Sequence, residues 1–364
     1  MNKLIERIAT ERNISEKSKQ NYYCAVNKYE EFTGKSIDVL LEEAEQEEEA
    51  GIRWKNRQLK QYLVGFRSML SQTYTKNCSK SYFTVIKTIY THEEIEIHSL
   101  PSFVNKQAIE NEITFDDLIT KEELLSSYNY GDNLTKALIL FMSSSGVSRT
   151  DTCNITVGQF IDACKHYITT THLEDQLNEL ADQDVVPTFQ LKRQKTSKYF
   201  YTFCTPECVK QIIYYLNNRK ELSYDDKLFD IHPVSINRKF QRINDDLQLG
   251  EAGSYRKLVP HMLRKYQASV LTNCKNHLTE EEVDVIQGRS KDTIHRAYFK
   301  NDPKVLKEKY IKCIRDLSIL SEDKFISSEL MVENSKLKNK IDEQDNKLNT
   351  VIANQKRLEV LLNK

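Results

Sequence analysis

The sequence has few of the residues that interrupt helices. Its 364 residues include only 9 Gly and 6 Pro, the two residue types that most often mark turns and loops. Hydrophobic residues make up 39% of the chain and charged residues 29%, which excludes a disordered composition and is untypical of an all-β protein. We therefore expect a mainly helical protein, long enough for two domains and an appendage.

Long apolar runs and paired cysteines are also missing. No run of about 18 apolar residues is present, so the sequence predicts no transmembrane helix. The segment MNKLIERIATERN carries charges throughout and has no apolar signal-peptide core. Eight Cys occur without a CxxC pair, so we expect reduced thiols and a cytoplasmic location. Cys204 and Cys208 come nearest to a ligand pair, but no second pair lies nearby, and we expect neither zinc nor another cofactor.

The chain has no net charge either, with 53 basic and 53 acidic residues and an isoelectric point near 7.1. The charges are nevertheless unevenly distributed. Residues 40–51, LLEEAEQEEEAG, form an acidic block, whereas residues 192–198, 256–265 and 291–312 are strongly basic. Local patches set the electric field at a binding surface, so a neutral average does not exclude a polyanionic partner.

Residues 1–97 are predicted to form a helical domain. Apolar and aromatic residues recur at helical spacing in ISEKSKQNYYCAVNKYEEFTGK, WKNRQLKQYLVGFRSMLSQTY and SKSYFTVIKTIYTHE. The Lys, Arg and Tyr side chains among them suit a phosphate backbone and equally suit an ordinary solvated helix, so both interpretations stay open. Residues 98–116, which include SLPSFVNKQ, are predicted to connect this domain to the next.

Residues 117–320 are predicted to form an α+β domain, made mostly of helices. TKEELLSSY begins with a Thr cap, and LTKALILFMSSSGVSR is apolar enough for a buried helix. VVPTFQLKRQKTSKYFYTFCTPE alternates on either side of a polar turn, which predicts a small β-hairpin. The fold class is therefore mainly α with one small sheet.

Residues 321–364 are predicted to form a C-terminal coiled coil. Apolar residues follow 3,4 spacing there, at Leu330, Leu337, Val351 and Leu358 on one heptad position and Ile341, Leu348 and Leu362 on the other. Polar residues at Asn334, Gln344 and Gln355 weaken the seam. The alternative is a single amphipathic helix that folds back on the body.

One segment gathers positive charge around a phenol. Residues 287–300, QGRSKDTIHRAYFK, place four basic side chains and a histidine near Tyr298. A solvated helix face with a half-buried aromatic residue would explain this pattern. The alternative is that Tyr298 is a nucleophile and the cations bind a phosphate, since nearby positive charges lower the pKa of a phenol from its usual value of about 10.

Other basic residues occur in similarly distinctive settings along the second domain. One arginine follows a buried helix and a glycine in SSSGVSRTD, a lysine occupies the hairpin turn, and an HxxR pair shares one face of a helix that Pro260 helps to start. A further arginine precedes Tyr298 by nine residues. In chain order these residues are Arg149, Lys195, His261, Arg264 and Arg289.

This order resembles the tyrosine recombinase (phage integrase) family, in the style of archaeal integrases. The resemblance covers residues 117–320 and is carried by SSSGVSR, RQKTSKYFYTFCTPE, PHMLRK and QGRSKDTIHRAYFKNDPKVLKEKYI. The N-terminal helices resemble the core-binding domain of that family by position and character. The resemblance implies a helical core-binding domain, residues 1–97, and a catalytic domain, residues 117–320.

The resemblance also implies a reaction without metal or ATP. Tyr298 attacks phosphorus and holds the DNA end as a 3′-phosphotyrosyl ester, while Arg149 and Arg264 clamp the phosphate. Guanidinium groups suit this role because they offer planar, bidentate donors. No Asp/Glu cluster with metal-binding spacing occurs among these motifs, which disfavours two-metal hydrolysis.

The remaining residues take supporting roles by resemblance. Lys195 protonates the departing 5′-hydroxyl, with Lys198 as the alternative, and His261 assists proton transfer near the phosphate. Two positions depart from the family pattern. Asp151 stands two places after the first arginine rather than three, and Arg289 stands where the family usually has His or Trp; an arginine can still donate to a phosphate oxygen.

The implied partner is double-stranded DNA with specific sites, and the implied location is the nucleoid. Four protomers are implied to assemble on two duplexes, and the reaction passes through a Holliday junction. Integration or excision of a mobile element is the expected task. Three alternatives stay open: a type IB topoisomerase that relaxes supercoils, a DNA-binding regulator without catalysis, and a coiled-coil scaffold. The scaffold would leave the basic constellation unexplained.

Overall fold

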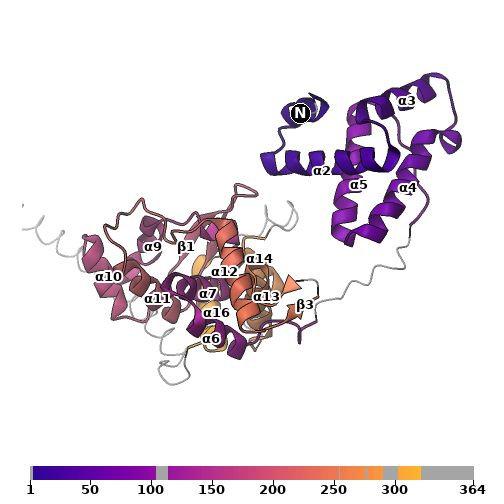
Figure 1. The fold of residues 1–364 in the computed structure, drawn as a ribbon. Coiled ribbons are helices and arrows are strands. Elements are labelled where there is room, and N and C mark those ends of the chain that lie inside the picture. The colour runs from indigo at the N-terminus through magenta and orange to yellow at the C-terminus, as the bar shows by residue number, and fades with distance from the viewer. Residues whose placement is uncertain (1–2, 104–113, 254, 276–277, 290–301, 321–364) are drawn as a thin grey trace, which may run out of the picture. The chain divides into compact units, whose positions relative to one another are not determined.

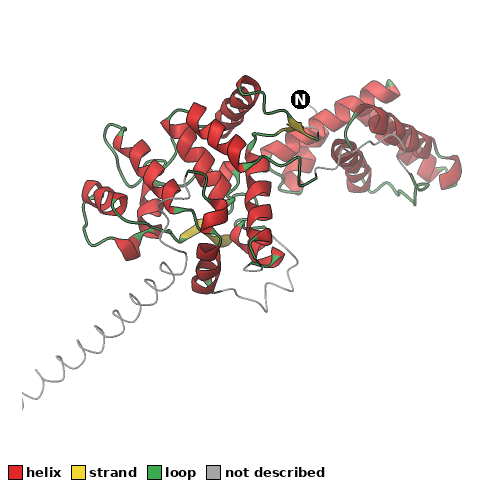
Figure 2. Ribbon diagram, turned by 90° about the horizontal axis from the view of Figure 1, so that it is seen from below, coloured by secondary structure: helices red, strands yellow, loops and turns green. Residues whose placement is uncertain are grey.

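The computed structural model describes residues 3–103, 114–253, 255–275, 278–289 and 302–320 (Figure 1). The chain divides into two compact units, Met1–Glu112 and Ile113–Lys364. Helices make up most of both units, and the strands are short (Figure 2). The predicted fold class, mainly α with a small β-hairpin, is confirmed. The predicted coiled coil lies outside the described residues.

The first unit is helical throughout its described part. Its elements are α1 (Lys3–Glu11), α2 (Glu16–Thr33), α3 (Ile37–Glu49), the 3₁₀ turn η1 (Trp54–Asn56), α4 (Gln58–Thr73) and α5 (Lys76–His92). Ser15 caps α2 by accepting from the backbone N–H of Ser18, and the helix ends before Gly34, as the TGK sequence predicts.

Buried aromatic residues join the helices of this unit. Tyr29 of α2 and Tyr90 of α5 are fully buried, and their hydroxyl oxygens lie 3.2 Å apart. The Tyr29 ring also meets Phe66 of α4 edge to face, with the ring centroids 4.9 Å apart. Such aromatic pairs contribute about 0.5–1.5 kcal/mol beyond the burial of their area. The unit therefore has a core of its own.

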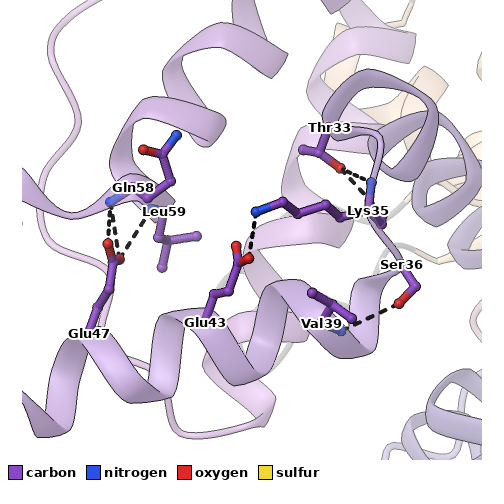
Figure 3. A network of polar contacts seen from close by, with 8 residues as sticks. All are labelled: Thr33, Lys35, Ser36, Val39, Glu43, Glu47, Gln58 and Leu59. Carbon is purple, nitrogen blue, oxygen red and sulfur yellow. Dashed lines mark hydrogen bonds and ion pairs between the residues drawn. The ribbon is translucent and has the colours of Figure 1, made fainter.

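The acidic block lies on α3, where some of its carboxylates have structural partners (Figure 3). Glu47 accepts hydrogen bonds from the backbone N–H groups of Gln58, at 2.8 Å, and Leu59, at 3.5 Å, at the start of α4. Glu43 accepts from Lys35 at 2.5 Å. A carboxylate at a helix N-terminus satisfies N–H groups that have no partner within the helix. Part of the negative charge therefore holds helices together.

The second unit contains most of the elements. Its helices are α6 (Lys121–Tyr130), α7 (Asn133–Ser145), α8 (Arg149–Thr152), α9 (Val157–Ala163), α10 (Leu173–Ala181), α11 (Pro206–Asn217), α12 (Pro233–Asp246), α13 (Pro260–Asn273), α14 (Glu280–Ile286), α16 (Pro303–Lys312) and α17 (Ile314–Leu317), with the 3₁₀ turn η2 (Lys165–Tyr167). Its strands are β1 (Phe189–Lys192), β2 (Tyr199–Thr202), β3 (Glu251–Ala252) and β4 (Tyr255–Arg256).

Helix α7 runs through the centre of this unit, between α11 and α13 (Figure 1). From Ala137 to Met142 every side chain is buried, which explains its nearly continuous apolar sequence. Helix α6, packed beside it, follows the Thr120 cap that the sequence predicts, and Thr120 forms a capping box with Glu123. Because α7 is surrounded, the chain that leaves its C-terminal end is held at a fixed place in the unit.

The predicted hairpin is present as the antiparallel pair of β1 and β2. Phe189 pairs with Thr202 and Lys192 with Tyr199. Burial alternates along β1, with Phe189 and Leu191 inward and the residues between and after them exposed. The inward side chains belong to the main core of the unit, so the turn of the hairpin is anchored to the body by both strands.

All eight cysteines are free thiols. Six are buried in the second unit, and the two in the first unit, Cys24 and Cys78, are partly exposed. Burial raises the pKa of the Cys164 and Cys204 thiols above the ordinary value.

Within the described part of the chain, no group of three His, Cys, Asp or Glu side chains is placed to hold a metal ion. Among the helices that the structure describes, none is long and apolar enough to cross a bilayer.

Candidate active site

A cavity of about 760 Å³ lies in the second unit, and several of its lining residues are basic. No carboxylate is among the described residues that line it. The basic and imidazole side chains come from the hairpin turn, from α13 and from the segment that follows α14: Arg193, His261, Arg264, Lys265 and Arg289. Segments almost a hundred residues apart in sequence thus present their positive charges to one space, which suits an anion.

Helix α13 supplies three of these side chains because the three residues are spaced to lie on one face of the helix. Pro260 occupies the first turn, where its missing N–H costs nothing. His261, Arg264 and Lys265 then fall on one face, at positions three and four residues apart. The predicted pairing of His261 with Arg264 on one helix face therefore agrees with the structure.

The guanidinium of Arg264 is buried and held by two backbone carbonyls. Its Nη1 donates to the carbonyl of Gly146 at 2.5 Å, and its Nη2 donates to the carbonyl of Gln287 at 2.6 Å. The residue is only 6% exposed. Both acceptors are neutral, so these bonds orient the guanidinium without cancelling its charge.

Gln287 and Gly146 form the support of this arginine. The Gln287 amide donates to the Arg264 carbonyl at 2.8 Å and to Gln267 Oε1 at 2.6 Å. Gly146 ends α7 with a φ of +63°, and a Cβ there would lie 2.6 Å from Gln267 Oε1. A residue with a side chain would be strained in this backbone conformation and would also displace Gln267.

The electrostatics of the cavity favour a bound anion. Burial, followed by the charges of Arg289 and Arg193, lowers the pKa of Arg264 to about 9, which leaves it charged at neutral pH. Asp151 and Asp284 act in the opposite direction, but more weakly. Desolvation of the His261 ring, followed by the charges of Lys265, Arg289 and Arg264, lowers the pKa of that histidine. An anion in the cavity would reverse both effects.

The hairpin turn places Arg193 at the cavity, while Lys195 and Lys198 are exposed and do not line it. The Arg193 carbonyl accepts from the Ser197 N–H at 2.8 Å, which closes the turn. The Arg193 guanidinium donates to the carbonyl of Gly288. Arg193 is a cavity residue that sequence reasoning missed. Strand alternation offered a signal, because residues 189 and 191 point inward and residue 193 continues that phase.

Arg149 lies at the first position of α8, half-buried, and does not line the cavity. Its neighbour Ser148 does, and caps α8. The Ser148 hydroxyl donates to Asp151 Oδ2 at 2.6 Å, and Asp151 Oδ1 accepts from the backbone N–H of Gln194 at 2.9 Å. Asp151 therefore ties the Arg149 segment to the hairpin turn, which keeps the two close together.

Arg289 brings the segment that leads toward Tyr298 to the cavity. It lines the cavity, and its Nη1 lies 3.5 Å from Oδ1 of Asp284 in α14. Gly288, just before it, approaches β2 so closely that a Cβ would lie 2.7 Å from the ring of Phe200. Tyr298 itself lies outside the described residues. The structure therefore brings together His261, Arg264 and Arg289 of the predicted site and adds Arg193 and Lys265.

Replacing Gly146 by alanine should cost more stability than replacing Gly250. Both glycines have positive φ, but nothing lies within 4 Å of a Cβ at Gly250. The backbone strain costs about 1–2 kcal/mol in either variant, and the clash with Gln267 adds about 1–3 kcal/mol at Gly146. Hydrogen exchange of the α7 amides measures this difference in the second unit. Equal losses in G146A and G250A would contradict the tight packing.

Phosphate should raise the pKa of His261. Without an anion we expect a value below the ordinary 6.5, because desolvation and three cations oppose protonation. Inorganic phosphate in the cavity would stabilise the protonated ring. NMR titration of the histidine ring protons with and without phosphate measures the shift. His232, which caps α12 and does not line the cavity, is the internal control; a shift at both rings or at neither contradicts the site.

The sequence matches no protein-family profile, and no curated protein matches it. Solved structures do match. A lambda integrase tetramer bound to a Holliday junction aligns with a TM-score of 0.53 at 11% identity, over 82% of this chain and 77% of that one. The Tn1549 transposon integrase aligns with a TM-score of 0.49 at 14% identity, over 82% and 94%. The XerH recombinase aligns with a TM-score of 0.48 at 15% identity, over 84% and 82%. The chain therefore has the fold of the tyrosine recombinases.

Proposed function

We propose that the protein is a site-specific DNA recombinase that breaks and rejoins strands through Tyr298. The observation that carries this proposal is the cavity that has no carboxylate among its described lining residues and receives His261, Arg264 and Arg289. The order of these residues in the sequence is that of the tyrosine recombinases, and the chain has the fold of these proteins. The lambda integrase that it resembles in fold was solved on a Holliday junction.

Arg264 is the side chain best prepared to hold the scissile phosphate. A guanidinium has five N–H donors, and two of its nitrogens are oriented by the carbonyls of Gly146 and Gln287. The donors that remain can bind non-bridging phosphate oxygens. Because this arrangement exists before the substrate arrives, it stabilises the developing charge at little cost in reorganisation, and such donors contribute about 3–4 kcal/mol each.

Tyr298 is the proposed nucleophile. It follows Arg289 by nine residues, and nine residues span at most about 30 Å, so the chain length allows the phenol to reach the phosphate. Its oxygen forms a bond to phosphorus while the bond to the 5′-oxygen breaks. The phosphotyrosyl ester conserves the bond energy, so rejoining to another strand requires no ATP.

Lys195 is the proposed acid for the departing 5′-hydroxyl, with Lys198 as the alternative. Both belong to the turn that Arg193 fixes at the cavity. Arg193 cannot take this role, because an arginine does not lose its proton in proteins. We assign it a share in binding the phosphate. Desolvation lowers the pKa of His261, which favours the neutral ring, and a neutral ring can accept a proton beside the phosphate.

Arg149 is proposed as the second arginine of the clamp. Its neighbour Ser148 lines the cavity, and Asp151 joins its segment to the hairpin. Arg289 takes the position where the family usually has His or Trp, and we assign it the role of a further donor to the phosphate because it lines the same cavity. The first unit is proposed to bind DNA as a core-binding domain. Its basic and aromatic helices suit a phosphate backbone.

The biological task that we propose is integration or excision of a mobile element by four protomers on two duplexes. Residues 321–364, whose heptads predict a coiled coil, add a contact between protomers. This contact would hold a dimer together before two DNA sites meet. The proposal extends the resemblance, since the lambda integrase of similar fold was solved as a tetramer.

Tyr298→Phe should bind DNA and form no covalent adduct. The substitution removes one oxygen and keeps the ring, so only the nucleophile is lost. The measurement is a denaturing gel of protein mixed with its DNA site, in which the wild type gives a slower protein–DNA band. A covalent band from the phenylalanine variant would overturn the assignment. Relaxation of supercoiled plasmid without joining of specific sites would favour a topoisomerase instead.

Lys195→Ala should slow strand cleavage far more than Lys198→Ala. Loss of a general acid typically costs a factor of about 100–10,000 in rate, whereas Lys198 contributes only charge under this assignment. Both lysines are exposed, so neither change should affect folding. Cleavage rates on DNA with a 5′-phosphorothiolate, whose leaving group needs no proton, provide the control, because they should be similar in both variants. The reverse order on ordinary DNA would assign the acid to Lys198.

A further inference from the structure

The cavity has an apolar part that a phosphate does not use. Beside its cations lie Phe115, Leu118 and Ala268. Phe115 is 68% exposed, more than any other large hydrophobic side chain in the described part of the chain. Single exposed hydrophobic residues are common and need no explanation. An exposed phenyl ring in the lining of a cationic cavity is different, because the same ligand could contact both the ring and the cations.

Three hydrogen bonds close the turn that carries Phe115. Asp117 Oδ2 accepts hydrogen bonds from the backbone N–H of Thr114, at 2.8 Å, and from its hydroxyl, at 2.9 Å. The backbone N–H of Leu118 donates to the Phe115 carbonyl at 3.1 Å. The two hydrogen bonds from Thr114 are also the main reason that the pKa of Asp117 is lowered. A short turn closed in this way presents its aromatic residue at little further entropic cost.

The size of the cavity also favours a ligand larger than a phosphate. Its volume is about 760 Å³, within the range of roughly 300–1,000 Å³ that is typical of sites for whole small molecules. A single phosphate group would leave much of this space empty. The lining therefore fits a ligand with an anionic part for Arg264 and Arg289 and a flat, apolar part for Phe115.

We propose that this cavity binds a whole nucleotide, with the phosphate on the arginines and the base stacked on Phe115. For DNA this means that the base next to the scissile phosphate leaves the helical stack and lies against the phenyl ring. Stacking on the aromatic side chain offsets part of the cost of unstacking the base. The identification of the phosphate as the scissile one depends on the proposed function, whereas binding of a nucleotide does not.

The first experiment compares inorganic phosphate with thymidine 3′-monophosphate by calorimetry. Wild type should bind the nucleotide more tightly, by about 5- to 150-fold for a stacking gain of 1–3 kcal/mol. Phe115→Ala should remove this preference and leave the affinity for phosphate unchanged, and Phe115→Tyr, which keeps the ring, should retain it. Leu125→Ala is the matched control, because Leu125 is an exposed hydrophobic residue of the same unit that does not line the cavity.

The second experiment uses the DNA on which wild type forms its adduct, with 2-aminopurine next to the scissile phosphate. Its fluorescence should rise on binding to wild type and to Phe115→Tyr, but not to Phe115→Ala. A preference for the nucleotide that survives Phe115→Ala overturns the inference, as does equal fluorescence with all three proteins. If wild type forms no adduct but the nucleotide preference depends on Phe115, the proposed function fails and the nucleotide site stands.

Discussion

The candidate site depends on one buried guanidinium. Arg264 is held at the cavity because the carbonyls of Gly146 and Gln287 accept two of its N–H groups. The residue that ends α7 is a glycine, and a side chain there would clash with Gln267 and crowd Gln287. Since both acceptors are neutral, the charge stays available to a ligand. The end of the central helix, the HxxR helix and the segment before Tyr298 therefore meet at one side chain.

Local signals in the sequence were sufficient to predict several elements of the fold and part of the candidate site. The Thr120 cap, the apolar run of α7 and the alternation on both sides of the hairpin turn each predicted the element that the structure contains. The spacing of His261 and Arg264 placed both on one helix face. These features depend on neighbours within a few residues, so periodicity and caps reveal them.

The rest depends on contacts between distant segments. The sequence pointed to Lys195 as the catalytic residue of the hairpin turn. Arg193 is instead the residue of that turn that lines the cavity, and its guanidinium donates to the carbonyl of Gly288. Nothing close to Phe115 in sequence indicates that it lies beside α13. The catalytic roles of all six predicted site residues remain predictions, and Arg149, Lys195 and Tyr298 are not among the described residues that line the cavity. The neutral net charge is compatible with a basic site because the opposite charges are used in different places. Glu43 and Glu47 accept hydrogen bonds within the first unit, whereas the cavity is lined by basic residues.

The distribution of thiols has a practical consequence. The six cysteines of the second unit are buried, whereas Cys24 and Cys78 of the first unit are partly exposed. Thiolates are the reactive species, and buried thiols with raised pKa form them slowly. A maleimide dye will therefore attach to the first unit before it reaches the second. The wild-type chain can thus carry a fluorescent label that reports on the helical domain without altering the residues around the cavity.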